Sequence, residues 1–373
     1  MNESRRRPRV AVVFGGKSSE HAISCVTAGS VLAAIDREAY DVVPIGIATD
    51  GRWVLESGDP ERLRIEGPDR LPQVDGERAT IALAPESAST GLVVTEPSQP
   101  PRALGDVDVV FPLLHGPWGE DGTIQGLLEM AGVRYVGAGV LASAVSMDKA
   151  YMKVVLAAAG LPVLPSVTVT AREWGRDAEA CRVRADALGY PLFTKPARGG
   201  SSMGISKVHD RSELDDAIEE ALRHDPKVLV EAAAVDAREV ECGVLEGTDG
   251  DPETSVPAEI RISEEHEFYD FAAKYLPEEH TELDVPADLP DALARQIQEL
   301  SVRAFEAVGC EGLARVDFFV LPGERVVVNE INTMPGFTPT SMFPRMWAAS
   351  GVDYPALVDR LIQLALRRDT GLR

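Results

Sequence analysis

Two strand-like runs near the C-terminus, residues 314–320 and 325–332, constrain the fold of this chain more than any other stretch. Both runs are rich in valine or phenylalanine and a Pro-Gly pair stands between them, so the pattern predicts a β-hairpin. If residues 321–324 form the loop, Val320 pairs with Arg325. Polar residues inside such an apolar hairpin then need an explanation.

Four polar residues interrupt the two strands at alternate positions: Arg315 and Asp317 on the first, Glu330 and Asn332 on the second. Alternate side chains share a face, and in this register Arg315 lies opposite Glu330, so all four would share one face. Their apolar neighbours there would be Phe319, Val326 and Val328. Two carboxylates and an amide oxygen suit Mg²⁺, while the arginine suits an anionic substrate or a developing oxyanion. A surface hairpin with an Arg315–Glu330 ion pair is an equally good interpretation of these residues alone.

The residues that follow the second strand favour the metal interpretation. The stretch 329–338 reads Asn-Glu-Ile-Asn-Thr-Met-Pro-Gly-Phe-Thr and ends the strand at a glycine whose N–H can approach a ligand closely. Together with Arg315-x-Asp317, it resembles the metal and oxyanion end of the ATP-grasp ligases, and most closely the D-alanine–D-alanine ligase family.

This resemblance implies an α/β (α+β) chain with an ATP-grasp fold and an N-terminal Rossmann-like (pre-ATP-grasp) α/β domain. Three domains are expected: residues 1–147 for the first substrate, 148–241 with the phosphate lid, and 242–373 with the metal site, a mobile loop and the second-substrate site.

Composition and charge are compatible with an enzyme that acts on small-molecule substrates. The 373 residues suffice for two or three domains, and the formal net charge of −23 argues against a nucleic-acid partner, which needs a basic surface. Four cysteines without CxxC spacing are typical of reduced thiols in a cytosolic protein. The apolar run Val10–Phe14 is too short for a signal peptide, and no run is long enough to cross a bilayer. The protein is expected in the cytoplasm.

Near the N-terminus, the apolar run at residues 10–14 predicts a strand. A Gly-rich loop and a helix to about Ala34 are predicted to follow it. A P-loop is excluded because Ala11 stands where that motif needs glycine. Glu20, in the first helical turn, is either a carboxylate favoured by the helix dipole or a ligand for a substrate amino group. The resemblance implies that Glu20 binds the ammonium of the first D-alanine.

A second buried strand, residues 107–114, leads into His115 and a Gly-rich loop. Ligands of open α/β sheets bind at the carboxyl ends of strands, which makes His115 a candidate rather than an ordinary structural histidine. It matches the family's His-Gly…Glu-Asp-Gly stretch and is expected to assist at the first-substrate pocket. The stretch 137–142 fits a dinucleotide fingerprint loosely but lacks the later acidic residue, so a glycine turn entering a helix is preferred.

Two lysines are candidates for phosphate contacts. Lys149 lies in the first turn of an Ala-rich helix, where the dipole does not favour it, so it is either a solvated lysine or a phosphate contact. Lys195 precedes a Gly/Ser loop that could wrap phosphates, although a flexible hairpin is as good an interpretation of the residues alone. Its order resembles the family's phosphate lid. The resemblance implies that Lys149, Lys195 and Ser202 bind nucleotide, and that Ser201 orients the lid and the substrate.

The stretch 231–234 resembles the family's adenine hinge, with Glu231 and Ala234 as contacts and Glu239 at the ribose. Without the resemblance, Glu231 would be an ordinary carboxylate at a strand end. Ala232 replaces the lysine common in the family, which puts one adenine contact in doubt.

The long irregular segment around residues 267–275 is either a surface loop with aromatic anchors or a lid. Its Tyr-Asp…Ala-Lys-Tyr matches the family's mobile loop. This implies that Lys274 reaches ATP phosphate and that Tyr275 bonds Ser201 and Glu20.

The reaction implied by the resemblance is ATP plus two D-alanines giving D-alanyl-D-alanine, ADP and phosphate through an acyl phosphate, for peptidoglycan precursors. Two Mg²⁺ ions, or Mn²⁺, would be held by Asp317, Glu330 and Asn332. The oxyanion would meet Arg315 and the N–H of Gly336, and Ser341 would bind the second carboxylate. A homodimer is expected, with no nucleic acid or membrane partner. The alternatives are a D-alanine–D-lactate ligase of the same family, an inactive ATP-grasp scaffold and a nicotinamide-dependent dehydrogenase.

Overall fold

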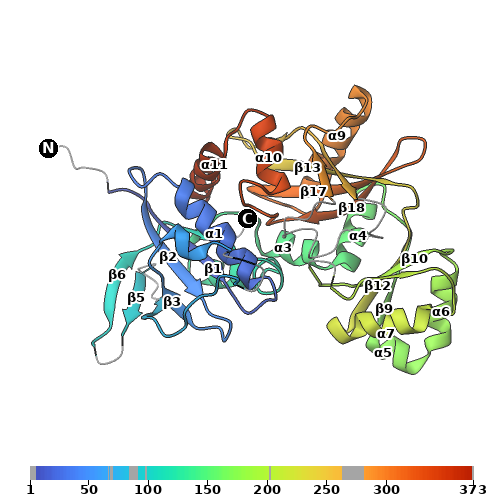
Figure 1. Ribbon diagram of the computed structural model, residues 1–373, viewed down its shortest axis with the longest axis horizontal. Coiled ribbons are helices and arrows are strands. Elements are labelled where there is room, and N and C mark those ends of the chain that lie inside the picture. Colours follow the sequence, from blue (N-terminus) through green and yellow to red (C-terminus); the bar gives the residue numbers. More distant parts are fainter. Residues whose placement is uncertain are drawn as a thin grey trace.

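The computed structural model describes residues 6–65, 67, 70–83, 91–96, 99–200, 203–262 and 281–371. Three sheets organise the chain into an N-terminal lobe, a central lobe and a C-terminal lobe (Figure 1). Within the described residues, no helix is both long and apolar enough to cross a membrane.

The N-terminal lobe is an eight-stranded sheet with the order β6-β5-β4-β3-β2-β1-β7-β8. Strands β2, β1, β7 and β8 are parallel, and the others add an antiparallel extension. The apolar run at residues 10–14 forms β1, as predicted. Every residue of that run is buried, so both faces of the sheet are covered at this strand. The strands are β1 (Arg9–Gly15), β2 (Asp41–Ile47), β3 (Trp53–Leu55), β4 (Thr80–Leu83), β5 (Gly91–Thr95), β6 (Arg102–Asp106), β7 (Val109–Pro112) and β8 (Arg134–Tyr135). The helices are α1 (His21–Ala34), the 3₁₀ helix η1 (Pro60–Leu63), α2 (Thr123–Met130) and α3 (Val140–Met147).

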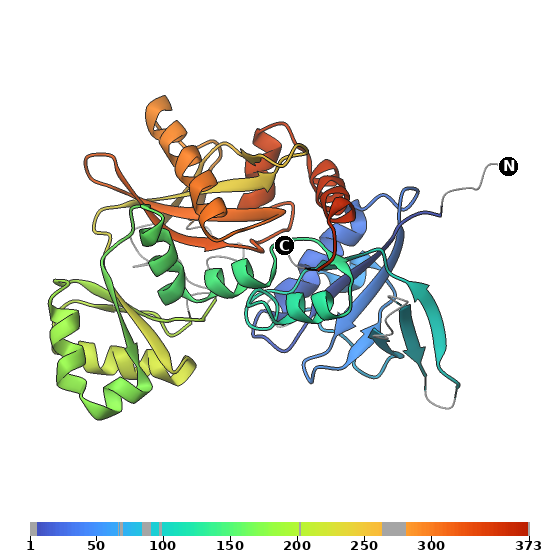
Figure 2. The ribbon, with the colours of Figure 1, turned by 180° about the vertical axis from the view of Figure 1, so that it is seen from behind.

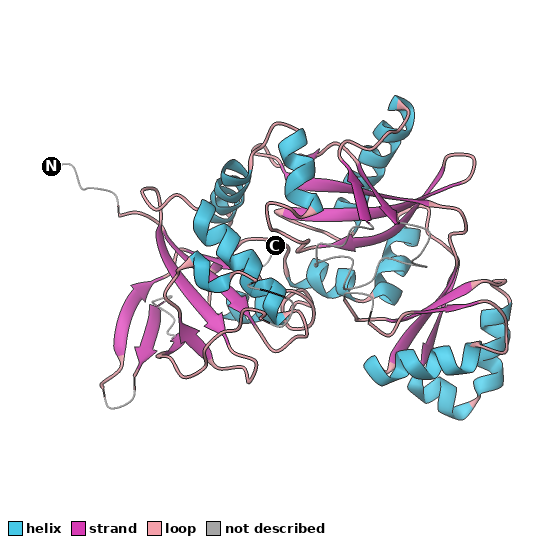
Figure 3. Cartoon of the chain, in the orientation of Figure 1, coloured by secondary structure: helices cyan, strands magenta, loops and turns pink. Residues whose placement is uncertain are grey.

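The central lobe is a four-stranded antiparallel sheet, β11-β10-β12-β9, with helices packed on one face (Figure 3). Its strands are β9 (Ser166–Thr170), β10 (Leu192–Pro196), β11 (Ser206–Val208) and β12 (Lys227–Ala232). Its helices are α5 (Ala171–Arg176), α6 (Ala178–Asp186) and α7 (Leu214–His224). One apolar core joins these helices to the sheet, so the opposite face stays available for polar residues.

The C-terminal lobe is a six-stranded sheet with the order β16-β15-β13-β17-β18, and β14 pairs with β13. Helices α4 and α9 share an apolar core with one face of β13, β17 and β18, while α10 packs against β13. The strands are β13 (Arg238–Glu246), β14 (Pro252–Thr254), β15 (Ala258–Ile262), β16 (Thr281–Asp284), β17 (Leu313–Leu321) and β18 (Arg325–Asn332). The helices are α4 (Lys149–Ala158), α9 (Asp291–Ala307), α10 (Met342–Ala349) and α11 (Tyr354–Arg367).

The predicted hairpin is present as β17 and β18, but its predicted register is wrong. Leu321, not Val320, pairs with Arg325, and Asp317, not Arg315, lies opposite Glu330. A β-bulge at Asp317/Phe318 adds a second shift.

The bulge follows from the side-chain pattern of β18. Val326 and Val328 are buried in the apolar core on one face, contrary to the prediction that they flank the polar residues. In a regular strand Glu330, two residues after Val328, would point to the same face as Val328. Val328 pairs with Phe318 and Glu330 pairs with Asp317, so Asn329 between them is an extra, unpaired residue. This bulge turns Glu330 to the cavity face. The four polar residues therefore still share a face.

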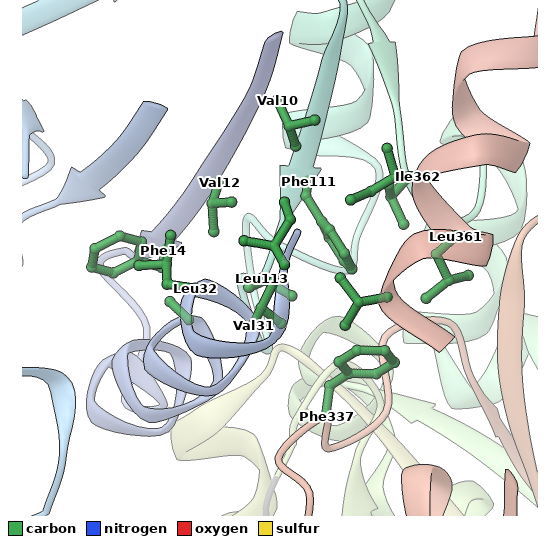
Figure 4. Close-up of a cluster of buried hydrophobic side chains, with 14 of the residues drawn as sticks. Val10, Val12, Phe14, Val31, Leu32, Phe111, Leu113, Phe337, Leu361 and Ile362 are labelled. Carbon is green, nitrogen blue, oxygen red and sulfur yellow. The ribbon is translucent and has the colours of Figure 1, made fainter. Parts of the chain in front are cut away.

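The N-terminal and C-terminal lobes are joined by one apolar core (Figure 4). Phe111 of β7 meets Phe337 edge to face, with ring centroids 6.0 Å apart, and Leu361 and Ile362 of α11 complete the cluster. The central lobe has its own separate core. In Figure 1 and Figure 2, α4 lies between the sheet of the C-terminal lobe and the central lobe, and α3 precedes it on the side of the N-terminal lobe.

Candidate active site

A cavity of about 600 Å³ lies where the three lobes meet. Its walls carry residues that the sequence analysis had selected from widely separated stretches. These are Glu20, His115, Lys149, Lys195, Glu231, Ala234, Glu239, Arg315, Asp317, Glu330, Asn332, Gly336 and Ser341.

One end of the cavity carries the acidic group from the hairpin. Arg315 donates two hydrogen bonds of 2.7 Å to Asp317, and its Nε is also 3.1 Å from Oε2 of Glu241. Although burial alone would lower it, these carboxylates hold the pKa of Arg315 well above its ordinary value. Asn332 donates from Nδ2 to Asp317 at 3.0 Å. The arginine is therefore fixed beside the carboxylates, and no ion pair with Glu330 is needed to hold it.

Lys149 connects this acidic group to the root of the Gly-rich loop. Its Nζ donates to the carbonyl oxygen of Gly199 at 2.8 Å and lies 3.5 Å from Oε2 of Glu330. Its backbone N–H donates to the carbonyl oxygen of Ala197 at 2.9 Å. The lysine is thus an ordered, mostly buried cation inside the cavity, and not a solvated one.

Glu20 lies at the start of α1, directly before His21, and is buried. Two glycines leave the space that its carboxylate fills. An added Cβ on Gly116 would clash with Oε2 of Glu20, and one on Gly200 would lie 2.9 Å from the same atom. His115 lies beside it, and burial lowers the pKa of His115 despite the neighbouring Glu20 charge. A neutral imidazole and a carboxylate therefore form the walls of a small polar pocket.

Glu120 also lines the cavity, and the sequence analysis assigned it no role. Its Oε2 accepts a hydrogen bond of 2.5 Å from the N–H of Gly116. Burial first, and then the charge of Glu20, raise the pKa of Glu120 to about 8. The signal was present in the Glu-Asp-Gly stretch after His115, but its position next to Glu20 depends on the fold.

Lys195 of β10 and Glu231 of β12 are neighbours on the cavity face of the central sheet, with Nζ and Oε2 2.9 Å apart. A second lysine, Lys153 of α4, contacts the other oxygen of Glu231. Burial alone would raise the pKa of Glu231, but the two ammonium groups outweigh it and lower that pKa. Lys153 was not predicted from the sequence as a site residue, although it lies one helical turn after Lys149.

The stretch at the end of β12 also lines the cavity, together with Glu239 of β13. The N–H groups of Ala232 and Ala233 donate to the carbonyl oxygens of Pro165 and Pro191. This fixes the backbone of the predicted adenine hinge against the base of the central lobe.

Gly336 and Ser341 line the same cavity and contact each other in the turn before α10. Ser341 precedes α10, and its Oγ is 2.7 Å from Oγ1 of Thr338. An added Cβ on Gly336 would lie 3.2 Å from that same Oγ, so the glycine allows the close approach of this turn.

Four predicted site residues lie outside the described residues: Ser201, Ser202, Lys274 and Tyr275. The stretch 137–142 is a glycine turn that enters α3, as preferred from its sequence.

The side chains present fit a nucleotide triphosphate with Mg²⁺. Lys149 and Lys195 supply buried positive charge next to the Gly-rich loop, which suits phosphate. Asp317, Glu330 and Asn332 supply hard oxygen ligands on one face, although Asp317 is shared with Arg315. Among the described residues, no group of three or more His, Cys, Asp or Glu side chains forms a metal site, so a cation here would keep water or phosphate ligands.

Comparison with known families gives two matches that together span most of the chain. Residues 9–138 match the family described as D-ala D-ala ligase N-terminus, and residues 155–363 match the D-ala D-ala ligase C-terminus.

Similar proteins are found among curated sequences and solved structures. The D-alanine–D-alanine ligase of Paenarthrobacter aurescens is 59% identical over 369 residues, covering 98% of this chain and 97% of that protein. The structure of the D-alanine-D-alanine ligase from Coxiella burnetii is 37% identical, with a TM-score of 0.76, 96% of this chain and 94% of that chain covered. The VanG D-Ala:D-Ser ligase from Enterococcus faecalis is 36% identical, with a TM-score of 0.82 and coverages of 96% and 100%.

Proposed function

This chain belongs to the D-alanine–D-alanine ligase family and joins two D-alanines in an ATP-dependent reaction, and we propose that the side chains around its cavity divide that reaction as follows. It is an ADP-forming carbon–nitrogen ligase with the three-domain ATP-grasp fold, and its product is a peptidoglycan precursor. The proposal concerns the roles of individual residues.

The first D-alanine binds with its ammonium on Glu20, next to the neutral His115. Glu20 is buried and closely enclosed by glycines, so its carboxylate is held in place at the wall of the cavity. A charged carboxylate in a mostly dehydrated pocket binds an ammonium group more strongly than it would in water.

ATP lies between the central and C-terminal lobes, with Lys149, Lys195 and Ser202 at its phosphates, Glu231 and Ala234 at the adenine, and Glu239 at the ribose. Asp317, Glu330 and Asn332 hold magnesium, as two ions or with Mn²⁺ in its place, and the bound metal offsets charge on the phosphates. Lys149 supports this assignment because it reaches both Glu330 and the loop residue Gly199.

The carboxylate of the first D-alanine attacks the γ-phosphate and ADP leaves, which gives an acyl phosphate. The amine of the second D-alanine then attacks the acyl carbon, and inorganic phosphate leaves. Arg315 and the N–H of Gly336 stabilise the oxyanion, Ser341 binds the carboxylate of the second D-alanine, and Ser201, Lys274 and Tyr275 close the site against water.

The domain limits are proposed at residues 1–147, 148–241 and 242–373, with one sheet centred in each. Two elements cross these limits: β13 is a strand of the third sheet that the limit at 241 divides, and α4 packs on that sheet although it lies within 148–241.

A cytoplasmic homodimer without a nucleic-acid partner is also proposed. The four cysteines are unpaired and buried, which suits a reducing compartment, and the net charge of −23 disfavours nucleic acid. Leu127 and Met130 of α2 and Leu141 of the adjacent α3 are exposed apolar side chains that could cover one another between two copies.

The observation that carries the residue assignments is convergence. Residues from positions 20 to 341, chosen from separate motifs, line one cavity. If these motifs had only structural roles, their polar side chains would not need to line the same cavity.

The test is phosphate release from ATP in the presence of D-alanine, D-serine, D-lactate or L-alanine. We expect D-alanine to be the best second substrate. Glu330→Gln should lower turnover by roughly a hundredfold or more, since it removes a metal-binding charge, while thermal unfolding stays close to that of the wild type. Wild-type turnover in that variant would refute the metal assignment.

A further inference from the structure

Three charged side chains form a largely buried triad at the predicted phosphate site. Glu231 is 1% exposed, and its two oxygens face two different lysines. Oε2 is 2.9 Å from Lys195, and Oε1 contacts Lys153. With two ammonium groups and one carboxylate, the formal charge of this triad is +1.

The two lysines differ in what they can reach. Lys195 and Glu231 line the cavity, whereas Lys153 is 5% exposed and is not among the lining residues. Lys153 comes from α4, in the core of the C-terminal lobe, and reaches Glu231 from behind. It can therefore act on a ligand only through Glu231.

The two contacts of Glu231 have opposite consequences for a bound nucleotide. A carboxylate with only Lys195 as partner would hold that lysine back from a phosphate. If Lys195 then turned to the phosphate, it would leave a buried negative charge unpaired, and an unpaired buried charge is costly. A second cation on the far oxygen of Glu231 removes this conflict.

We propose that Lys153 is a positioning residue for nucleotide binding, which neutralises Glu231 from behind the cavity so that Lys195 is free to contact phosphate. The inference rests on the proposed role of Lys195 as a phosphate contact. It adds a residue that never touches the nucleotide, and it explains why a lysine is buried in the helix one turn after Lys149.

The test compares Lys153→Met, Glu231→Gln and the double variant. Lys153→Met should raise the KM for ATP and the Kd for ADP, titrated without D-alanine, by roughly 10- to 100-fold, by analogy with the range found for groups that orient metal ligands. The KM for D-alanine should change less than about twofold, which corresponds to a few tenths of a kcal/mol.

The double variant separates this role from a purely structural one. Without charge at position 231, Lys195 is no longer held back, so Lys153→Met should add no further loss of ADP affinity to Glu231→Gln. Lys153→Arg keeps the charge and should restore much of the affinity. Additive losses, or ADP affinity unchanged in a folded Lys153→Met protein, would overturn the proposal. If Lys153→Met does not fold, the double variant, which removes the buried carboxylate together with the more deeply buried ammonium group, is compared with Glu231→Gln and decides the question.

Two further variants complete the design. Lys227→Met is the control. It breaks the ion pair between Lys227 of β12 and Asp148, which caps α4, and should leave the Kd for ADP near the wild-type value. Lys195→Met should weaken ADP binding in any case. If Lys195→Met leaves the Kd for ADP unchanged, the phosphate role of Lys195 is refuted, and the proposal for Lys153 is refuted with it. If Lys195→Met weakens ADP binding but Lys153→Met does not, only the proposal for Lys153 is refuted.

Discussion

At the scale of single residues, the site is defined as much by missing side chains as by charged ones. Gly116 has a φ of +73°, a conformation that favours glycine, and it lies against the Glu20 carboxylate. Its N–H also holds Glu120, so one glycine positions two carboxylates. The sequence showed a Gly-rich loop after His115 but not which glycine approaches which acid.

Gly116→Ala should therefore raise the KM for the first D-alanine by about tenfold or more, because the new methyl group displaces Glu20. Gly132→Ala is a matched control, since Gly132 has a φ of +65° but no atom within 4 Å of an added Cβ. Both variants should lose about 1 kcal/mol of stability through backbone strain. Steady-state kinetics would contradict this prediction if both variants behaved alike.

Glu120 should give stability a pH dependence of defined sign. Its folded-state pKa of about 8 lies above the ordinary value of 4.5, so between these values the folded protein keeps a proton that the unfolded chain releases. Stability from this group is therefore lost as pH rises from about 5 to 8. Glu120→Gln should remove that slope, measured as the free energy of unfolding without ATP, D-alanine or Mg²⁺. Glu38→Gln, at an exposed glutamate, should keep it.

At the scale of elements, the hairpin and the root of the Gly-rich loop show how strands and helices aim the side chains. The bulge at Asn329 turns Glu330 to the cavity while Val328 stays in the core. At the loop root, Arg198 donates three hydrogen bonds to the buried Asp225, which also accepts one from the N–H of Lys227. The loop therefore starts from a fixed point.

Asp225→Asn should release that fixed point. Removing the buried charge leaves Arg198 without its partner, and we expect a loss of about 2–3 kcal/mol, reduced by the partial exposure of the arginine. Amides at residues 197–200 should exchange faster with deuterium. Asp210→Asn, at an exposed carboxylate in the same lobe, should change stability by less than about 0.5 kcal/mol. Unchanged exchange at the loop root would show that Asp225 does not hold it.

At the scale of the whole molecule, two lobes form one body and the third is attached to it. Helix α11 packs against the N-terminal sheet, and Tyr40 bonds Asp359 across that boundary. Arg368 then pairs with Glu246 at 2.8 Å and donates to the carbonyl oxygen of Gly137 at 2.6 Å. The proposed pockets for the first D-alanine and for the metal are therefore built on one framework.

Calorimetry should show the N-terminal and C-terminal lobes unfolding in one transition, because a single core spans them. Arg368→Ala should destabilise this transition by about 2–4 kcal/mol, since it removes the cation that pairs with Glu246 and the hydrogen bond to the carbonyl oxygen of Gly137. Arg367→Ala, at the exposed neighbouring position, should have little effect. Separate transitions for the two lobes in the wild type would refute the shared framework.

The sequence by itself determined the local structure and the chemical inventory. Apolar runs predicted β1 and β7, and the order of the motifs identified the family, because these signals depend on neighbours in the chain. Only the tertiary structure decided which groups meet: the bulge that orients Glu330, the enclosure of Glu20 by Gly116 and Gly200, and the contact of Lys153 with Glu231. These contacts join segments that are far apart in the sequence. They therefore leave no local repeat pattern from which they could be predicted.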